Sequence, residues 1–239
     1  FFEHTIGRSI IQLHFKFAII AHGLSLHRHD ILSERDAEDI INDKSKPIPI
    51  NIDEEYTLNV KGLYSEIVAF ISRAQTQMTP EQANELFELR AAGRDIVEAI
   101  KDTKHLHKNL YKYIVSDNQY IRDEYNKIRM QLLSVLRRID ETRQGGDILS
   151  LDNVKLEMEL NDTTANGMLE KLIHEDKIAA EMATSLMNDS AYAYDVTKNL
   201  VLMAETLFAK GDLGMKEAER SLVLDDDEMD EILKSQQNG

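Results

Sequence analysis

Residues 79–114 follow one uninterrupted helical pattern, and this pattern limits the fold more than any other feature of the chain. Thr79 can cap a helix, and Pro80 stands at the first helical position, where proline is favoured. Apolar and small residues then recur at alternating steps of three and four: Leu86, Leu89, Gly93, Ile96, Ile100, Thr103, His107, Leu110 and Ile114. This spacing turns one face of a helix towards its neighbours. The stretch therefore predicts a long helix within an all-α bundle.

The same pattern returns one hundred residues later, which predicts a second long helix over residues 176–210. Its stripe is Met182, Leu186, Asp189, Ala193, Val196, Leu200, Met203 and Leu207. Four residues are identical between the two copies: Ala83, Leu86, Ala91 and Asp95 recur as Ala183, Leu186, Ala191 and Asp195. Any two bundle helices share their apolar phase, so an internal duplication and a chance match both stay open.

Composition agrees with an all-helical chain and narrows its function. Only three of the 239 residues are proline, and strand signals are nearly absent. The net charge of -15 argues against a general role in binding nucleic acid or anionic lipid, because both need a basic surface. The chain has no cysteine, so disulfides and thiolate sites are excluded. No apolar run reaches the roughly 20 residues that a membrane-spanning helix needs.

The chain divides into four predicted parts. Residues 1–43 form an N-terminal amphipathic helical segment, which either covers the bundle or lies beneath a membrane. Residues 53–145 form a first helical bundle, in which Asp53 and Ser116-Asp117 are expected to start helices. Gly145-Gly146 marks the boundary with the second half, residues 147–210, and residues 211–239 form an acidic tail.

Two polar residues interrupt the apolar stripes, Asp189 in the second long helix and His107 in the first. A lone buried carboxylate costs several kcal/mol, so Asp189 must be paired, protonated, metal-bound or turned out of the core. Pairing is the preferred interpretation, through Ser185, Asn188, Ser190 or a tyrosine on a neighbouring helix. Whether Asp189 meets His107 in space stays open.

A second polar group lies beside the stripe of the first long helix. Glu98, Asp102 and His105 share one helical face, and Asp102-x-x-His105 has the spacing of the Glu-x-x-His motif in di-metal bundles. Such sites need two motifs of this kind and further carboxylates, so a solvated charged face is the favoured interpretation. No nucleophile elbow, phosphate-binding glycine loop or thiol is present, and the chain is therefore not expected to be an enzyme.

Three segments together resemble a known family. They are residues 61–67 (KGLYSEI), residues 94–110 (RDIVEAIKD, then KHLHKNL from 104), and residues 180–192 (AEMATSLMNDSAY). As an ensemble, these segments resemble the PhoU-like C-terminal domain of bacterial sodium/phosphate cotransporters. The resemblance implies two pseudo-repeated three-helix bundles, here with an extra N-terminal helix.

The resemblance also implies a function. It predicts a non-enzymatic regulatory domain on the cytoplasmic side of the inner membrane that modulates sodium-dependent phosphate uptake. Its expected partner is a transmembrane transporter domain of the same chain or complex, with no nucleic acid and with a homodimer as one assembly. The alternative is a free-standing PhoU-type phosphate-signalling adaptor or a metal-binding helical bundle.

PhoU proteins bind metal clusters through a Glu/Asp-x-x-x-Asp motif in each half, and the resemblance extends in part to this motif. Asp95 and Asp195 match its final aspartate, whereas Ala91 and Ala191 occupy the place of its leading acid. The residues expected to hold a divalent metal or iron are Asp95, Asp102, Asp189 and Asp195. Without the two leading acids, each half offers a small ligand set for such an ion.

Overall fold

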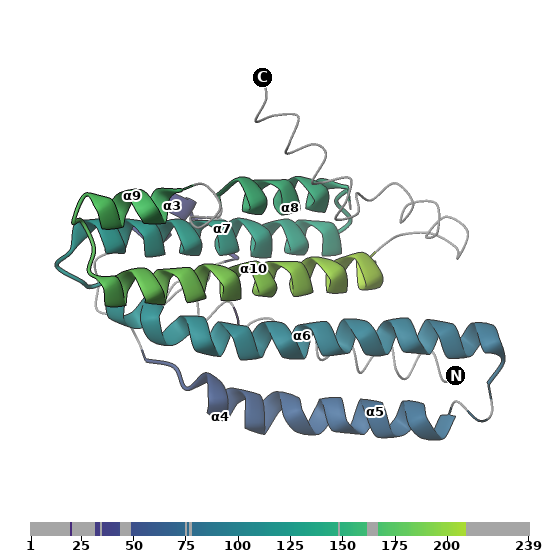
Figure 1. Ribbon diagram of the computed structural model, residues 1–239. Helices are drawn as coiled ribbons and strands as arrows, with labels where there is room; N and C mark the ends of the chain where they lie inside the picture. The colour runs from purple at the N-terminus through teal and green to yellow at the C-terminus, as the bar shows by residue number, and fades with distance from the viewer. Residues whose placement is uncertain are drawn as a thin grey trace.

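The described part of the chain is entirely helical (Figure 1). The computed structural model describes residues 20, 32–33, 35–43, 49–74, 76, 78–147, 149–161 and 167–208. Within these residues no β-strand occurs, which confirms the all-α prediction for this part of the chain.

The helices follow one another with short connections. In order they are α3 (Ala37–Ile41), α4 (Ile52–Tyr56), the π-helical turn η1 (Thr57–Lys61), α5 (Gly62–Ala74), α6 (Pro80–Tyr113), α7 (Gln119–Arg143), α8 (Ser150–Asn161), α9 (Met168–His174) and α10 (Ala180–Phe208). The single helix expected over residues 53–77 is thus a run of α4, η1 and α5, with a wider turn in its middle.

The start of α6 is the one that the sequence predicts. The Thr79 hydroxyl accepts a hydrogen bond from the backbone N–H of Gln82. In return, the Gln82 side chain accepts one from the backbone N–H of Thr79, at 3.2 Å. This reciprocal capping box satisfies two backbone donors that a helix start leaves without partners.

The long helices α6 and α10 run antiparallel and pack against each other along much of their length. Lys112, near the end of α6, lies opposite Glu181 at the start of α10, and His105 lies opposite Tyr192 one step further along. On its other side α10 packs against α7, to which it runs parallel (Figure 1). α10 is therefore the central helix, and the helices with similar sequences are direct neighbours.

The core lies along these helices and confirms most of the two predicted stripes. Leu86, Ile96, Ile100 and Leu110 of α6 are buried, as are Leu186, Val196, Leu200 and Met203 of α10. α6 is also covered by α4 and α5, on the side away from α10 in Figure 1. As a result α6 buries more than one face: Asp95, Ala92 and Ala99, beside the predicted stripe, are buried too.

Two predicted helix starts were wrong by a few residues. Asn51, rather than Asp53, caps α4, because its side-chain oxygen accepts from the backbone N–H of Glu54. Asn118, rather than Ser116 or Asp117, caps α7, accepting from the backbone N–H groups of Tyr120 and Ile121. The end before Gly145-Gly146 is confirmed, since α7 ends at Arg143 and Gly145 has a φ of 108°.

Some predictions fall outside the described residues. The N-terminal segment 1–43 lies there in large part, as do residues 162–166, residues 209–210 and the acidic tail 211–239. In the ranges that the structure describes, none of the helices combines the length and the apolar character that crossing a membrane requires.

Replacement of Thr79 by Ala removes the cap of α6 and is expected to lower the free energy of unfolding by about 1 kcal/mol. Ser72→Ala is the matched control, because the exposed Ser72 hydroxyl only donates to the carbonyl of Val68 inside α5. The control should change stability by less than about 0.5 kcal/mol. Urea denaturation followed by circular dichroism measures both variants, and equal effects would contradict the capping role.

Candidate functional site

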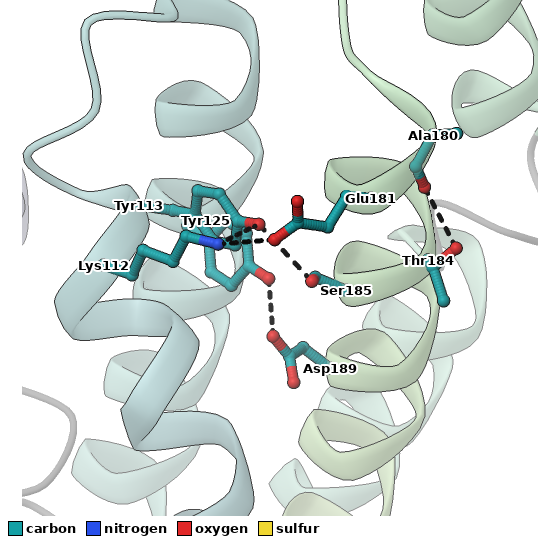
Figure 2. A network of polar contacts seen from close by, with 8 residues as sticks. All are labelled: Lys112, Tyr113, Tyr125, Ala180, Glu181, Thr184, Ser185 and Asp189. Carbon is teal, nitrogen blue, oxygen red and sulfur yellow. Dashed lines mark hydrogen bonds and ion pairs between the residues drawn. The ribbon is translucent and has the colours of Figure 1, made fainter.

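Asp189 of α10 lies in the contact between three helices. Its residue is only 1% exposed. The hydroxyl of Tyr125, on α7, donates a hydrogen bond of 2.5 Å to its Oδ2 atom (Figure 2). A second hydrogen bond joins Asp189 to the side chain of Asn109 on α6. The carboxylate thus binds one partner from each helix that packs against α10, which confirms the expected pairing with a tyrosine.

Burial controls the protonation of Asp189. The loss of water around the carboxylate raises its pKa from 3.8 to about 6. The hydrogen bonds from Tyr125 and Asn109, and the charge of His105, act in the opposite direction. A carboxyl group with a pKa near 6 changes its charge within the range that cells experience, unlike an ordinary aspartate.

Tyr125 is itself a core residue with no measurable exposure. Burial raises the pKa of its phenol, and the neighbouring Asp189 raises it further, so Tyr125 stays protonated and acts as a hydrogen-bond donor. Its ring stacks on that of Tyr113, with centroids 5.0 Å apart and planes inclined by 26°. The stacked rings connect the end of α6 with the beginning of α7.

The polar contacts continue from Tyr113 to the surface. The Tyr113 hydroxyl lies 3.4 Å from the Ser185 hydroxyl of α10 and 3.1 Å from the Lys112 ammonium group. Lys112 in turn binds the exposed Glu181 at 2.9 Å (Figure 2). A chain of polar groups therefore runs along the α6–α10 contact from the buried Asp189 to an ion pair in water.

In the other direction the contact contains an imidazole ring and two carboxylates. His105 of α6 stacks on Tyr192 of α10, with centroids 5.0 Å apart. Asp102 is half-buried, and its pKa is raised by burial and then by the nearby charge of Asp195. The charge of His105 acts against this rise. Two negative groups, Asp102 and Asp195, thus approach each other across the same helix pair.

These positions correct one interpretation of the sequence and answer another. The face with Glu98, Asp102 and His105 is not simply solvated, because α10 covers part of it. The histidine that acts on Asp189 is His105, whereas His107 lies against the ring of Tyr111 on its own helix. The apolar stripe of α6 includes His107, but the α10 contact turns His105 towards Asp189.

The four aspartates expected to bind metal do not meet at one point. Asp102, Asp189 and Asp195 face the α6–α10 contact, although Asp195 is exposed and Asp189 is fully buried. Asp95 lies two helical turns from Asp102, roughly 10 Å along the axis. There it is buried beside Arg94, with 3.5 Å between Arg94 Nη2 and Asp95 Oδ1. Burial raises the pKa of Asp95, and Arg94 opposes that rise.

This donor set does not fit the metal cluster that the family resemblance implies. Among the residues that the structure describes, no three histidine, aspartate or glutamate side chains are grouped so as to hold a metal ion. Asp189 already accepts two hydrogen bonds, and its raised pKa favours the protonated form, whereas a metal ligand must be ionised. Metal binding by these aspartates stays a prediction, and the proposed function below does not use it.

Sequence reasoning indicated that Asp189 needs a partner but did not identify Tyr125 or Asn109. Tyr125 carries a usable signal, since it is a tyrosine within the apolar stripe of α7 and its hydroxyl needs a buried acceptor. Asn109 has no comparable signal, because it lies beside the stripe of α6. Chemically, the arrangement can hold three helices together and can take up or release one proton.

A scan against models of known protein families, a search of curated proteins and a search of solved structures each found no match for this chain. The function proposed below is therefore inferred from the residues of the chain itself.

Replacement of Tyr125 by Phe removes one hydrogen bond from a buried carboxylate. The free energy of unfolding at pH 7 is expected to fall by about 1–3 kcal/mol. The pKa of Asp189 should rise further, because the Tyr125 hydrogen bond lowers it. Denaturation and carboxyl-carbon NMR measure the two effects. Tyr64→Phe, at a half-buried tyrosine of α5, is the control; an unchanged Asp189 pKa in Tyr125→Phe would contradict the contact.

Replacement of Asp189 by Asn removes the ionisation itself. Asp189 binds its proton more tightly in the folded chain than in the unfolded chain, so its contribution to stability is complete below about pH 4 and is lost as the pH rises to about 6. The stability of the wild type relative to Asp189→Asn should therefore fall by roughly 2–3 kcal/mol over that interval. Denaturation at a series of pH values measures this difference.

The matched control for this series is Glu170→Gln, which removes one exposed acid from α9. It is expected to follow the wild type at every pH. A difference between wild type and Asp189→Asn that stays constant from pH 4 to pH 7 would show that Asp189 does not titrate in this range.

Proposed function

We propose that this chain is a non-enzymatic regulatory domain of a sodium-dependent phosphate transporter, with a PhoU-like fold. The observation that carries the proposal is the meeting of two segments that resemble the PhoU-like family. His105 and Asn109 belong to the segment 94–110, and they contact Tyr192 and Asp189 of the segment 180–192. Residues far apart in sequence that carry the resemblance therefore form one interface.

The character of this interface supports a regulatory role. Asp189 and Tyr125 are closed off from solvent, so a substrate has no direct access to them. Their hydrogen bond joins α10 to α7, and Asn109 adds α6. Polar contacts of this kind between packed helices favour one arrangement of the helices over others. A domain that transmits a signal by shifting helices needs such a defined contact, whereas a catalytic site needs accessible groups.

The packing of α6 against α10 supports the PhoU-like twin arrangement. The two helices are related by the shift of one hundred residues, and they run antiparallel. A two-fold axis perpendicular to two equivalent helices produces this antiparallel contact. The proposed fold therefore has two similar bundles with α6 and α10 as their central helices.

The proposal includes the surroundings of the domain. The partner is a transmembrane transporter domain of the same chain or complex, the location is the cytoplasmic side of the inner membrane, and nucleic acid has no part in the function. The net charge of -15 agrees with the last point, because a strongly acidic surface repels phosphate backbones.

Uptake of radioactive phosphate tests this function. The complete gene is expressed with its neighbouring genes in a bacterium that lacks its own phosphate uptake systems. Uptake is expected with sodium and not with potassium as the external cation. Tyr125→Phe loosens the contact of α7 with α10 and should change the uptake rate several-fold at an equal amount of protein in the membrane, whereas Tyr64→Phe should not.

Three outcomes would overturn the proposal. Uptake that is absent or independent of sodium would remove the transporter. Sodium-dependent uptake that stays the same in Tyr125→Phe would remove the regulatory role. A change in a phosphate-responsive reporter gene without any change in uptake would instead favour the free-standing signalling adaptor.

A further inference from the structure

A cavity of about 530 Å³ lies at one end of the bundle, apart from the Asp189 contact. Its walls come from three places: the end of α3 at Ile41–Asp43, the turn between α6 and α7, and the first turns of α7. This volume lies within the usual range of roughly 300–1,000 Å³ for small-molecule sites. Neither the pattern of the long helices nor the proposed function explains the cavity.

A buried guanidinium group forms the deep part of the cavity. Arg129 of α7 is 1% exposed and is the largest fully buried side chain among the described residues. Its Nη1 atom donates to the carbonyl of Ile41 and to Oδ1 of Asn126, each at 3.1 Å. These contacts fix the plane of the guanidinium group against α3 and the first half of α7.

Arg129 keeps its positive charge in this place. Burial lowers its pKa to about 10, and the negative charge of Asp43 on the cavity wall opposes the change. A pKa near 10 leaves the group almost wholly protonated at neutral pH. The deep part of the cavity therefore holds a poorly hydrated cation, which an anionic group would stabilise.

The mouth of the cavity has the opposite charge. Asp117 and Asp123 line it and are both exposed. Arg122, also on the wall, donates to the carbonyl of Ser116 and to the side chain of Gln119. Gln119 donates in turn to Asp123. The first turn of α7 is thus held by side-chain contacts that leave two carboxylates at the opening.

We infer that this cavity binds a small zwitterion, with a carboxylate or phosphate group against Arg129 and an ammonium group facing Asp117 and Asp123. The planar fork of an arginine matches either anionic group. A polyanion does not fit, because it would meet three acidic residues on the walls: Asp43, Asp117 and Asp123. A simple cation does not fit either, because Arg129 would be its deepest neighbour.

The burial of the two charges sets the direction of the ligand. The anionic group lies inside, where the contact with Arg129 is shielded from water and strong. The ammonium group lies at the opening, where exposed carboxylates bind it more weakly. This site does not depend on the transporter proposal, and either one can fail without the other.

Isothermal titration calorimetry on the complete chain tests the inference with four probes. L-Serine carries a carboxylate and an ammonium group, phosphoethanolamine carries a phosphate and an ammonium group, and inorganic phosphate and ethanolamine each carry one half of the pattern. One of the two zwitterions is expected to bind with a Kd below about 1 mM, and at least about tenfold more tightly than either half. Which zwitterion binds identifies the anionic group.

Three variants locate the binding. Arg129→Lys keeps the charge but loses the fork, and should weaken the zwitterion about tenfold. Asp117→Asn combined with Asp123→Asn changes only exposed residues and should weaken the zwitterion by about threefold or more without weakening inorganic phosphate. Glu66→Gln, an exposed acid on α5, is the charge control and should bind as the wild type does.

Clear results would overturn the inference. It is wrong if neither zwitterion gives saturable binding, or if inorganic phosphate or ethanolamine binds as tightly as the better zwitterion. It is also wrong if the double variant at the mouth binds like the wild type. Because that variant leaves Arg129 and the core unchanged, it decides the question even if Arg129→Lys does not fold.

Discussion

The burial of the Asp189 carboxylate is the constraint on which the arrangement of the long helices depends. A carboxylate without water needs hydrogen-bond donors close by, and Tyr125 of α7 and Asn109 of α6 supply them. Apolar side chains tolerate small shifts of one helix past another, whereas these directional contacts do not. The position of α10 between α6 and α7 is therefore set by one polar residue within an apolar stripe, and the large core around it supplies the bulk of the stability.

The central place of α10 also explains why α6 is buried more widely than its stripe suggests. α10 covers one side of α6, and α4 and α5 cover another. Small residues such as Ala92 and Ala99 allow this close approach, and Asp95 is buried with them. Exposed lysines remain on the outer side of α6, where Lys101 binds Glu98 and Lys104 binds Asp53. A helix with two covered sides leaves only a narrow strip for solvated charge.

The sequence predicts what a helix decides locally, and it predicts less where the choice of neighbours matters. The Thr79 cap and the stripes of α6 and α10 follow from spacing and capping chemistry, and both are confirmed. The need of Asp189 for a partner also follows from its place in a stripe. Its actual partners do not, because Tyr125 meets Asp189 only once α7 lies against α10. The start of α7 shows the same limit: Ser116, Asp117 and Asn118 are all good caps, and the path of the turn selects Asn118.

The opposite directions of α6 and α10 have an electrostatic consequence for the backbone. Each long helix carries a partial positive charge at its beginning and a partial negative charge at its end, and two antiparallel neighbours largely cancel these macrodipoles. The end of α6 then lies beside the beginning of α10. Lys112, in the last turn of α6, and Glu181, in the first turn of α10, each complement their own helix and also pair with each other. One exposed ion pair thus neutralises two helix termini at once.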